Sequence, residues 1–206
     1  MMATTHALAG VALAVGVSLA VPEAGGLPVA AAALGGFFPD FDLTGDHRKT
    51  LHFPVYYTVA AVVAAAVATA VTTTATLAVA LFLAAAALHS VMDAAGGGLE
   101  PRPWLGRSDR AVYDHARRRW IAPRRWIRYD GAPEDLLLCV ALAVPGLAVL
   151  DGQGQLAIAA ALAISTLYTL ARKPLVAVAD RVVPRIPQDV FDRLPVRVVS
   201  FVAAYR

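Results

Sequence analysis

A histidine and an aspartate that can bind one metal ion stand four residues apart, at His89 and Asp93, at the end of a long apolar segment. If a helix continues through both residues, they share one face with their Cβ atoms about 5–6 Å apart. That separation suits two ligands of one metal ion, and it equally suits a hydrogen-bonded pair. The pair alone leaves both interpretations open.

Further histidines and aspartates stand at the ends of neighbouring apolar segments, namely His6, Asp40, Asp42, His47 and His52. Imidazole and carboxylate are the ligands of zinc, manganese and iron hydrolytic centres, in which a bound water with a pKa lowered to about 7 becomes the nucleophile. Singly, His6 is typical of an interfacial residue, and Asp40 with Asp42 is typical of a turn. Jointly they favour a metal centre, because ionisable groups near membrane depth cost about 2.5–3.5 kcal/mol each unless a cation or a functional pocket compensates them.

The order of these residues resembles the YdjM-like family, the membrane-bound metal-dependent hydrolases of bacteria and archaea that are related to zinc-dependent phospholipase C. The family shows an early histidine, a Pro-Asp-x-Asp element, a His-Arg-x-x-Thr-His-Ser element and a later His-x-x-x-Asp. The matching residues are His6, Pro39-Asp40-Phe41-Asp42, His47-Arg48-Lys49-Thr50-Leu51-His52-Phe53, and His89 with Asp93. In the third element Thr50 stands two residues before His52 and Phe53 replaces the serine, so His47 is expected to differ in role from His52. The resemblance covers about the first 105 residues.

By analogy with the ligand order of zinc phospholipases, the resemblance implies a divalent metal, zinc or alternatively manganese. The implied ligands are His6, Asp42, His52, His89 and Asp93. We expect metal-activated water to attack a phosphoester or another ester, with Arg48 and Lys49 steadying the developing negative charge. Either Asp40 or His47 is expected to act as the base that orients the water. The alternative is a non-enzymatic membrane scaffold or metal-dependent regulator.

The elements that must position these residues are apolar helices. The chain has 206 residues, of which 58% are hydrophobic and 16% charged, with a mean hydropathy of +0.61, which is outside the usual range of soluble domains. The 43 residues from Thr50 to Met92 include no Asp, Glu, Lys or Arg. As one helix they would reach about 65 Å, twice the thickness of a bilayer core. The sequence therefore predicts two helices with a turn at Thr72 to Thr74.

The same pattern predicts six membrane spans. They are expected at Ala7 to Val21, Gly26 to Phe38, Pro54 to Val71, Ala75 to Ser90, Leu136 to Leu150 and Gln155 to Ala171. The second is short and is either a full crossing or re-entrant, and the first is interpreted as a retained span rather than a signal peptide because it lacks a basic n-region. Cys139, the single cysteine, is expected to be a core residue. The predicted fold class is all-α, an integral membrane helical bundle of about six transmembrane helices with cytoplasmic termini.

The distribution of charge supports this topology. Six crossings place all 18 Lys and Arg on one side and leave the other side with two acids, Glu23 and Asp151, and no base. Since cytoplasmic loops carry the excess of basic residues, the basic face is expected in the cytoplasm, and the protein in the cytoplasmic (inner) membrane as a multi-pass protein. The expected regions are 1–135, with four spans and a basic aromatic loop at 94–135, then 136–173 with two spans, and an amphipathic tail at 174–206.

The basic aromatic loop is expected to lie on the membrane surface. Asp109 to Ala122 is predicted to form a surface helix, and His115 to face solvent or headgroups. The expected contacts with anionic lipid headgroups are Arg117, Arg118, Arg119, Arg124 and Arg125. Arginine beside tryptophan also occurs in nucleic-acid sites, but next to a membrane an interfacial anchor is favoured over nucleic acid. The run Gly96 to Gly98 is predicted to be a flexible link.

Overall fold

The computed structural model describes residues 1–22 and 25–193 and residues 198, 199, 202 and 205. The elements are α1 (Ala3–Ser18), α2 (Gly26–Phe37), the 3-10 helix η2 (Phe38–Thr44), α3 (Pro54–Ala70), α4 (Thr74–Ala95), η3 (Pro103–Leu105), β1 (Val112–Asp114), β2 (Arg119–Ile121), α5 (Pro133–Val149), α6 (Gly152–Val182), η4 (Val183–Arg185) and α7 (Gln188–Phe191). The all-α class is confirmed, with one small two-stranded sheet added to it.

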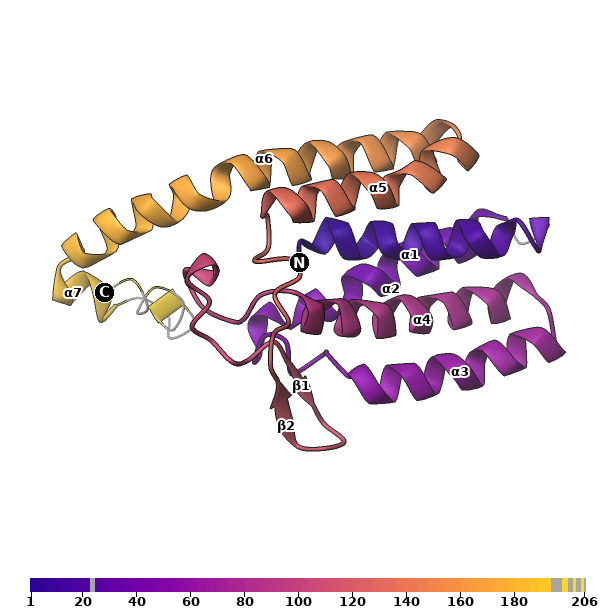
Figure 1. Cartoon of the computed structure of the whole chain (residues 1–206), viewed down its shortest axis with the longest axis horizontal. Helices are drawn as coiled ribbons and strands as arrows, with labels where there is room; N and C mark the ends of the chain where they lie inside the picture. The colour runs from indigo at the N-terminus through magenta and orange to yellow at the C-terminus, as the bar shows by residue number, and fades with distance from the viewer. Residues whose placement is uncertain (23–24, 194–197, 200–201, 203–204, 206) are drawn as a thin grey trace.

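Each of the six long helices overlaps one of the six apolar segments, and they run alternately in opposite directions (Figure 1). The turn between α3 and α4 lies at the predicted threonine cluster. There Thr73 caps α4: its side chain accepts a hydrogen bond from the Thr76 backbone, and the Thr76 side chain accepts one from the Thr73 backbone. Because the helices alternate in direction, the start of α1 and the ends of α2 and α4 meet at one end of the bundle.

Helix length gives limited support to the six spans. By length and composition alone, two helices among the described residues are able to cross a membrane, α4 and the stretch Gly152–Arg185. The apolar helices α1 and α3 have 16 and 17 residues. With its 12 residues, α2 extends over about 18 Å. The six-helix arrangement is thus present, whereas six crossings stay a prediction.

Glycines let α2 pack at backbone distance against its two neighbours. A Cβ at Gly10 of α1 would lie 2.2 Å from the carbonyl oxygen of Ala32 in α2. On the other face of α2, a Cβ at Gly35 would lie 2.1 Å from the carbonyl oxygen of Phe82 in α4. Since only glycine permits such an approach, these positions hold α2 between α1 and α4.

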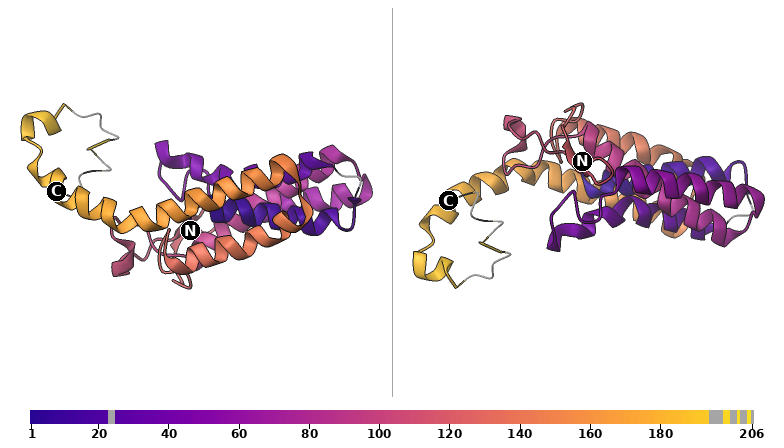
Figure 2. Two further views of the ribbon diagram at one scale, coloured as in Figure 1. Left: turned by 90° about the horizontal axis from the view of Figure 1, so that it is seen from above. Right: turned by 90° about the horizontal axis from the view of Figure 1, so that it is seen from below.

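The pair α5 and α6 forms a second layer over α1. Their shared core contains Leu8, Val11, Val15, Cys139, Ala143 and Ile158. Cys139 is fully buried there, as expected for a core residue. Beyond this core α6 continues past the end of the bundle towards α7, as the views from above and below show (Figure 2).

The prediction for the end of the sixth segment was wrong. Instead of ending near Ala171, α6 continues through Lys173 and Pro174 to Val182. Pro174 lacks an N–H and removes one hydrogen bond, but the turns on either side keep the helix continuous. The boundary expected between residues 173 and 174 is therefore not a helix end. Residues 194–197, 200, 201, 203, 204 and 206 of the expected tail lie outside the described residues.

The surface helix predicted from Asp109 to Ala122 is also wrong, because this segment forms the antiparallel hairpin of β1 and β2. Val112 pairs with Ile121, and Asp114 pairs with Arg119. The buried Asp114 carboxylate accepts the backbone N–H groups of residues 116 and 117, which closes the turn. That local hydrogen bonding outweighs the helix propensity of the arginines.

The glycine contact between α1 and α2 makes a prediction. Gly10→Ala should lower the free energy of unfolding by about 1–3 kcal/mol, because the new methyl group meets the Ala32 backbone. The matched control is Gly16→Ala on the same helix, where an added Cβ meets nothing within 4 Å and better helix propensity should leave stability equal or higher. Thermal unfolding of both variants in detergent, followed by circular dichroism, measures the difference. Equal stability of the two would contradict the close packing.

Candidate metal centre

Histidines and aspartates from four segments converge at the end of the bundle where the start of α1 meets the ends of α2 and α4 (Figure 1). The first turns of α1 supply His6, η2 supplies Asp40 and Asp42, the loop before α3 supplies His47, Arg48 and His52, and the end of α4 supplies His89 and Asp93. Since α2 returns to the end where α1 begins, His6 lies in the same cluster as the others. The alternative, in which α2 turns back and leaves His6 at the opposite end from Asp42, differs from this fold.

His52 is held from behind by Asp42. The Nδ1 of His52 donates to Asp42 Oδ2 at 2.9 Å, and the Nδ1 of His47 donates to Asp42 Oδ1 at 2.7 Å. Burial alone would raise the pKa of Asp42, but these two hydrogen bonds outweigh it and place the pKa well below its ordinary value. Asp42 is therefore an ionised acceptor that orients His52, with both oxygens engaged outside the cluster centre.

His89 is oriented in the same way by the backbone. Its Nδ1 donates to the carbonyl oxygen of Gly36 at 2.6 Å. In the neutral ring this leaves Nε2 without a hydrogen, and the same holds for His52. The two Nε2 atoms lie 3.1 Å apart and face each other. Two lone pairs at that distance require a positive charge between or beside them.

Asp93 lies among the rings with its carboxylate buried. Its Oδ2 is 3.1 Å from the Nε2 of His52 and 3.4 Å from the Nε2 of His89, yet it has no hydrogen-bond partner among the described residues. Its Oδ1 lies 3.2 Å from the Met1 amino group and 3.4 Å from Arg48 Nη2. Asp93 lies in the last turn of α4, where the helix dipole disfavours a negative charge, so a nearby cation would stabilise it further.

His6 completes this side of the cluster. Its ring stacks on His89 with centroids 3.7 Å apart. The Nε2 of His6 is 3.2 Å from Asp93 Oδ1 but is not aligned for a hydrogen bond, and neither ring nitrogen has a partner among the described residues. A fully buried imidazole with no partner is costly unless a ligand binds it.

The two aspartates of η2 lie on different sides of the His52 ring. Asp40, expected to be the base that orients the water, directs Oδ1 towards the cluster, 3.5 Å from His89 Nε2 and 3.9 Å from His52 Nε2. Asp42, expected to be a ligand, lies on the far side of His52, where its two oxygens accept from His52 and His47. Burial would raise the pKa of Asp40, but the neighbouring His89 ring outweighs burial and lowers it. Asp40 is partly exposed and also borders the adjoining cavity.

The donor set fits a transition-metal ion. His6, His89 and Asp93 form one group and Asp40, His52 and His89 another, each with ligand atoms within 4.8 Å of one another. His89 belongs to both groups, and because its Nδ1 is occupied by Gly36, only Nε2 is available to bind a metal ion. The two groups therefore describe one centre of imidazole nitrogens and the Asp93 carboxylate, with the partly exposed Asp40 on its cavity side, and this donor set suits zinc or manganese.

Arg48 ties this centre to the loop that follows α4. With a φ of 60° it directs its buried guanidinium to Asp93 and donates through Nη1 to the Gly97 carbonyl oxygen at 2.7 Å. The run Gly96 to Gly98 was predicted to be a flexible link, but its backbone packs closely against the segment around Arg128. A Cβ at Gly97 would lie 2.4 Å from the Arg128 carbonyl oxygen.

Lys49 and His115 both lie outside the cluster, and the surroundings of each differ from those expected. Lys49 was expected to steady charge at the site, but it pairs with Asp46 at 2.9 Å on the surface. His115 was expected to face solvent or headgroups. Instead it is half-buried against Phe53, and its Nε2 donates to the Lys49 carbonyl oxygen at 2.7 Å, which docks the hairpin on the loop before α3.

Asp135 is a supporting residue that the sequence analysis missed. It is fully buried at the N-terminus of α5 and accepts hydrogen bonds from the Met2 and Gly131 backbone and from Thr5 Oγ1. These bonds fix the first turn of α1, which carries His6. In the sequence, Asp135 stands just before an apolar segment, and this position indicates only a favourable interaction with the dipole of the following helix.

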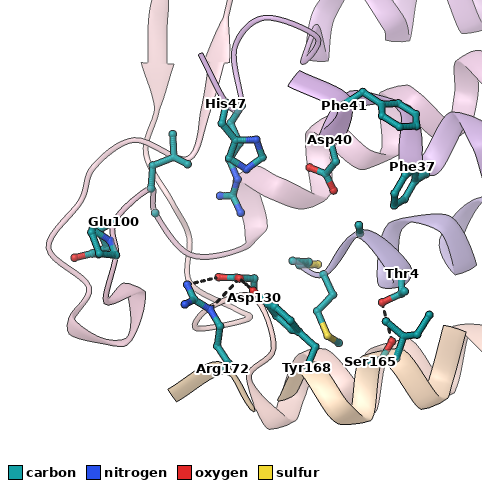
Figure 3. A pocket seen from close by; sticks show the side chains of 18 of the residues that line it. Thr4, Phe37, Asp40, Phe41, His47, Glu100, Asp130, Ser165, Tyr168 and Arg172 are labelled. Carbon is teal, nitrogen blue, oxygen red and sulfur yellow. Dashed lines mark hydrogen bonds and ion pairs between the residues drawn. The ribbon is translucent and has the colours of Figure 1, made fainter. Parts of the chain in front are cut away.

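A cavity of about 800 Å³ adjoins the cluster, between the first turn of α1, η2 and α6 (Figure 3). Asp40, His47 and Arg48 line it on the cluster side. Tyr168 and Arg172 line it from α6, where both contact Asp130. The four-residue spacing of Tyr168 and Arg172 places them on one helix face, but nothing in the sequence relates that face to the histidines.

Comparisons of the chain with models of protein families, with curated proteins and with solved structures found no match. The resemblance to the YdjM-like hydrolases therefore rests on the motifs alone and stays a prediction. The inference of a cation site has a separate basis: Asp93 Oδ2 and both ring nitrogens of His6 are buried without a hydrogen-bond partner among the described residues, and the Nε2 atoms of His52 and His89 face each other beside them.

The separate positions of Asp42 and Asp93 make a prediction. Asp93→Asn should abolish stoichiometric metal binding, because it removes the buried charge at the centre. Asp42→Asn should retain the metal but weaken its affinity about 10–100-fold, the usual effect of removing a group that orients a ligand. The control is Asp46→Asn, the same chemical change at an exposed position of the neighbouring loop. Elemental analysis and competition with a chromogenic chelator measure these effects, and complete loss of metal in Asp42→Asn would instead identify Asp42 as a ligand.

Proposed function

We propose that this protein is a membrane-bound, metal-dependent hydrolase that acts on a phosphoester or another ester. The observation that carries the proposal is the convergence of three imidazoles and two carboxylates beside a cavity. A divalent cation bound there would supply Lewis acidity and lower the pKa of a water ligand towards neutrality. Hydrolysis then consumes water and the ester and releases an alcohol and an acid.

The surrounding residues have distinct parts in this proposal. Asp40 is the ionised carboxylate at the border of cluster and cavity, so its Oδ1 is placed to accept a proton from water. His47 also borders the cavity and is fixed by Asp42. Arg48 lines the cavity with a guanidinium held by carbonyl oxygens, which suits it to bind an anionic part of the substrate.

A membrane location with six crossings is the second part of the proposal. It is supported by the antiparallel order of six apolar helices and by large apolar side chains exposed on their outer faces. Examples are Val62, Val63, Leu137, Leu156 and Leu167, each at least 59% exposed. In water such surfaces would be costly, whereas lipid tails match them. The distribution of basic residues supports a cytoplasmic location for the cluster in this proposal.

Binding of anionic lipid headgroups by the basic aromatic loop is part of this proposal. Arg117, Arg118, Arg119 and Arg124 are exposed, and Arg124 lies over the ring of Trp126, which is itself 70% exposed. Arg125, expected to act in the same way, donates to the carbonyl oxygens of residues 106 and 108 and so stabilises the loop. Four of the five expected arginines therefore remain in the proposed headgroup surface.

Metal removal and restoration tests the hydrolase. Protein purified in detergent, stripped with a chelator and reloaded with zinc or manganese should hydrolyse bis(p-nitrophenyl) phosphate or p-nitrophenyl acetate, and the stripped protein should not. Asp40→Asn should lower kcat about 10²–10⁴-fold, as the loss of a general base does, and the control Asp46→Asn should keep full activity. A preparation with stoichiometric metal that turns over neither substrate contradicts the hydrolase and favours the scaffold or regulator.

Sidedness is tested by cysteine labelling in a Cys139→Ala background. Asp46→Cys, after η2, and Arg118→Cys, between β1 and β2, probe the cluster end of the bundle. Thr73→Cys and Asp151→Cys, in the turns before α4 and α6, probe the other end. A membrane-impermeant maleimide should label the first two from the cytoplasmic side alone and the last two from the opposite side alone. If the two ends report the same side, the bundle does not cross the membrane with this orientation.

A further inference from the structure

Asp42 connects two histidines, one inside the cluster and one on the wall of the adjoining cavity. The side chain of His52 is fully buried, and its Nε2 faces the centre of the cluster. The side chain of His47 is 35% exposed, and Figure 3 shows it on the same side of the cavity as Asp40. His47, Asp42 and His52 therefore form a hydrogen-bonded chain that leads from the cavity wall to the centre of the cluster.

The direction of each hydrogen bond in this chain follows from the charge of Asp42. An ionised carboxylate accepts hydrogen bonds and donates none, so both histidines donate to it through Nδ1. His47 occupies Oδ1 at 2.7 Å, and His52 occupies Oδ2 at 2.9 Å. The backbone N–H of Leu51 also lies 3.5 Å from Oδ2. Since the Asp42 side chain is fully buried, these donors set the orientation of its carboxylate.

The hydrogen bond from His47 keeps the Asp42 carboxylate turned towards His52. Without it, Oδ1 would be a buried charged oxygen that has lost its donor, which is costly. The carboxylate would then rotate about its Cβ–Cγ bond to find another partner. The two oxygens move together in such a rotation, so Oδ2 would leave the Nδ1 of His52. The orientation of the His52 ring thus depends on His47, although the two rings bind opposite oxygens of Asp42.

Backbone hydrogen bonds hold His47 in place. The Thr50 N–H donates to the carbonyl oxygen of Asp46 at 3.0 Å, which closes a turn around His47. The carbonyl oxygen of the next residue, Arg48, accepts the Tyr113 N–H at 2.9 Å, which fastens the turn to β1. His47 is therefore fixed by its own loop and by the hairpin, and the rest of the chain is positioned from it.

We infer that His47 is a positioning residue for the metal centre and acts on the His52 ring through Asp42. This inference rests on the metal centre of the proposed function, and it leaves the role of base to Asp40. The positioning role requires the N–H at Nδ1, whereas a base in the cavity would require the lone pair of Nε2. The two roles therefore depend on different nitrogens of the same ring.

Two substitutions of His47 separate these roles. Asparagine keeps an N–H donor near the position of Nδ1 and lacks Nε2, whereas leucine keeps most of the bulk and has no donor. His47→Leu should weaken zinc affinity about 10–100-fold, whereas His47→Asn should remain within about threefold of the wild-type chain. Competition with a chromogenic chelator, on full-length protein in detergent, measures both affinities. Equal affinities of the two variants would overturn the inference.

The matched control is His115→Leu. His115 also donates a hydrogen bond to the loop before α3, but its acceptor is the Lys49 carbonyl oxygen, at 2.7 Å from Nε2, rather than Asp42. His115→Leu should therefore keep the zinc affinity of the wild-type chain. If it weakens zinc binding as much as His47→Leu does, the effect is a general loosening of the loop, and the inference is wrong.

A double-mutant cycle tests whether His47 acts through Asp42. When Asp42→Asn is already present, adding His47→Leu should change zinc affinity by less than about threefold, because the link to His52 is already weakened. Additive losses in the double variant would show that His47 acts by another route and would overturn the inference.

The same binding measurements distinguish failure of this inference from failure of the proposed function. If the wild-type chain binds neither zinc nor manganese, the proposed metal centre is wrong. If it binds zinc and His47→Leu has the affinity of the control, the metal centre stands and the role of His47 is wrong. If the variants behave as expected but the metal-loaded chain hydrolyses no ester, the role of His47 stands and the proposed reaction does not.

Discussion

The buried carboxylate of Asp93, surrounded by three histidine rings, is the interaction on which the rest of this structure depends. A carboxylate removed from water is strongly destabilised unless cations and hydrogen bonds compensate it. Here Arg48 and the Met1 amino group lie beside Oδ1, whereas Oδ2 faces the Nε2 atoms of His52 and His89. A proton shared between two rings would satisfy one pair only. A metal ion would satisfy the nitrogens and the oxygen together, and this is the physical basis of the proposed metal centre.

The fold around this cluster serves to hold the rings with their Nε2 atoms inward. Gly36 provides the carbonyl that orients His89, and at the same position a Cβ would lie 2.3 Å from the His6 carbonyl oxygen. Gly36 therefore permits the close approach of α1 and also orients the His89 ring of α4. Asp42 orients His52, and Asp135 holds the turn that carries His6. Each of the three rings is thus positioned by a group outside the cluster centre, an arrangement that metal sites generally use.

The site and the proposed membrane location fit one another through α6. The first half of α6 packs on α1, and the second half continues beyond the bundle (Figure 1). Between the two, Tyr168 and Arg172 form the wall of the cavity opposite the cluster (Figure 3). The resulting cavity has charged groups at the level of the loops and apolar groups at the level of the helices. That order matches the order of headgroups and acyl chains in a bilayer leaflet.

The sequence by itself determined the helices and the residue types of the site. Apolar segments longer than a bilayer core must fold back, and the four-residue spacing of His89 and Asp93 places them on one helix face, so the six helices and most of the cluster could be predicted. Only the tertiary structure decided which aspartate of η2 faces the cluster, because Asp40 and Asp42 are two residues apart in a 3-10 turn and their directions depend on the contacts of His47 and His52. It also decided that the arginine-rich loop forms a hairpin and that α6 supplies the opposite wall of the cavity. These features arise from contacts between residues far apart in the chain, such as Arg48 with Gly97 and Thr4 with Ser165, and local spacing carries no information about them.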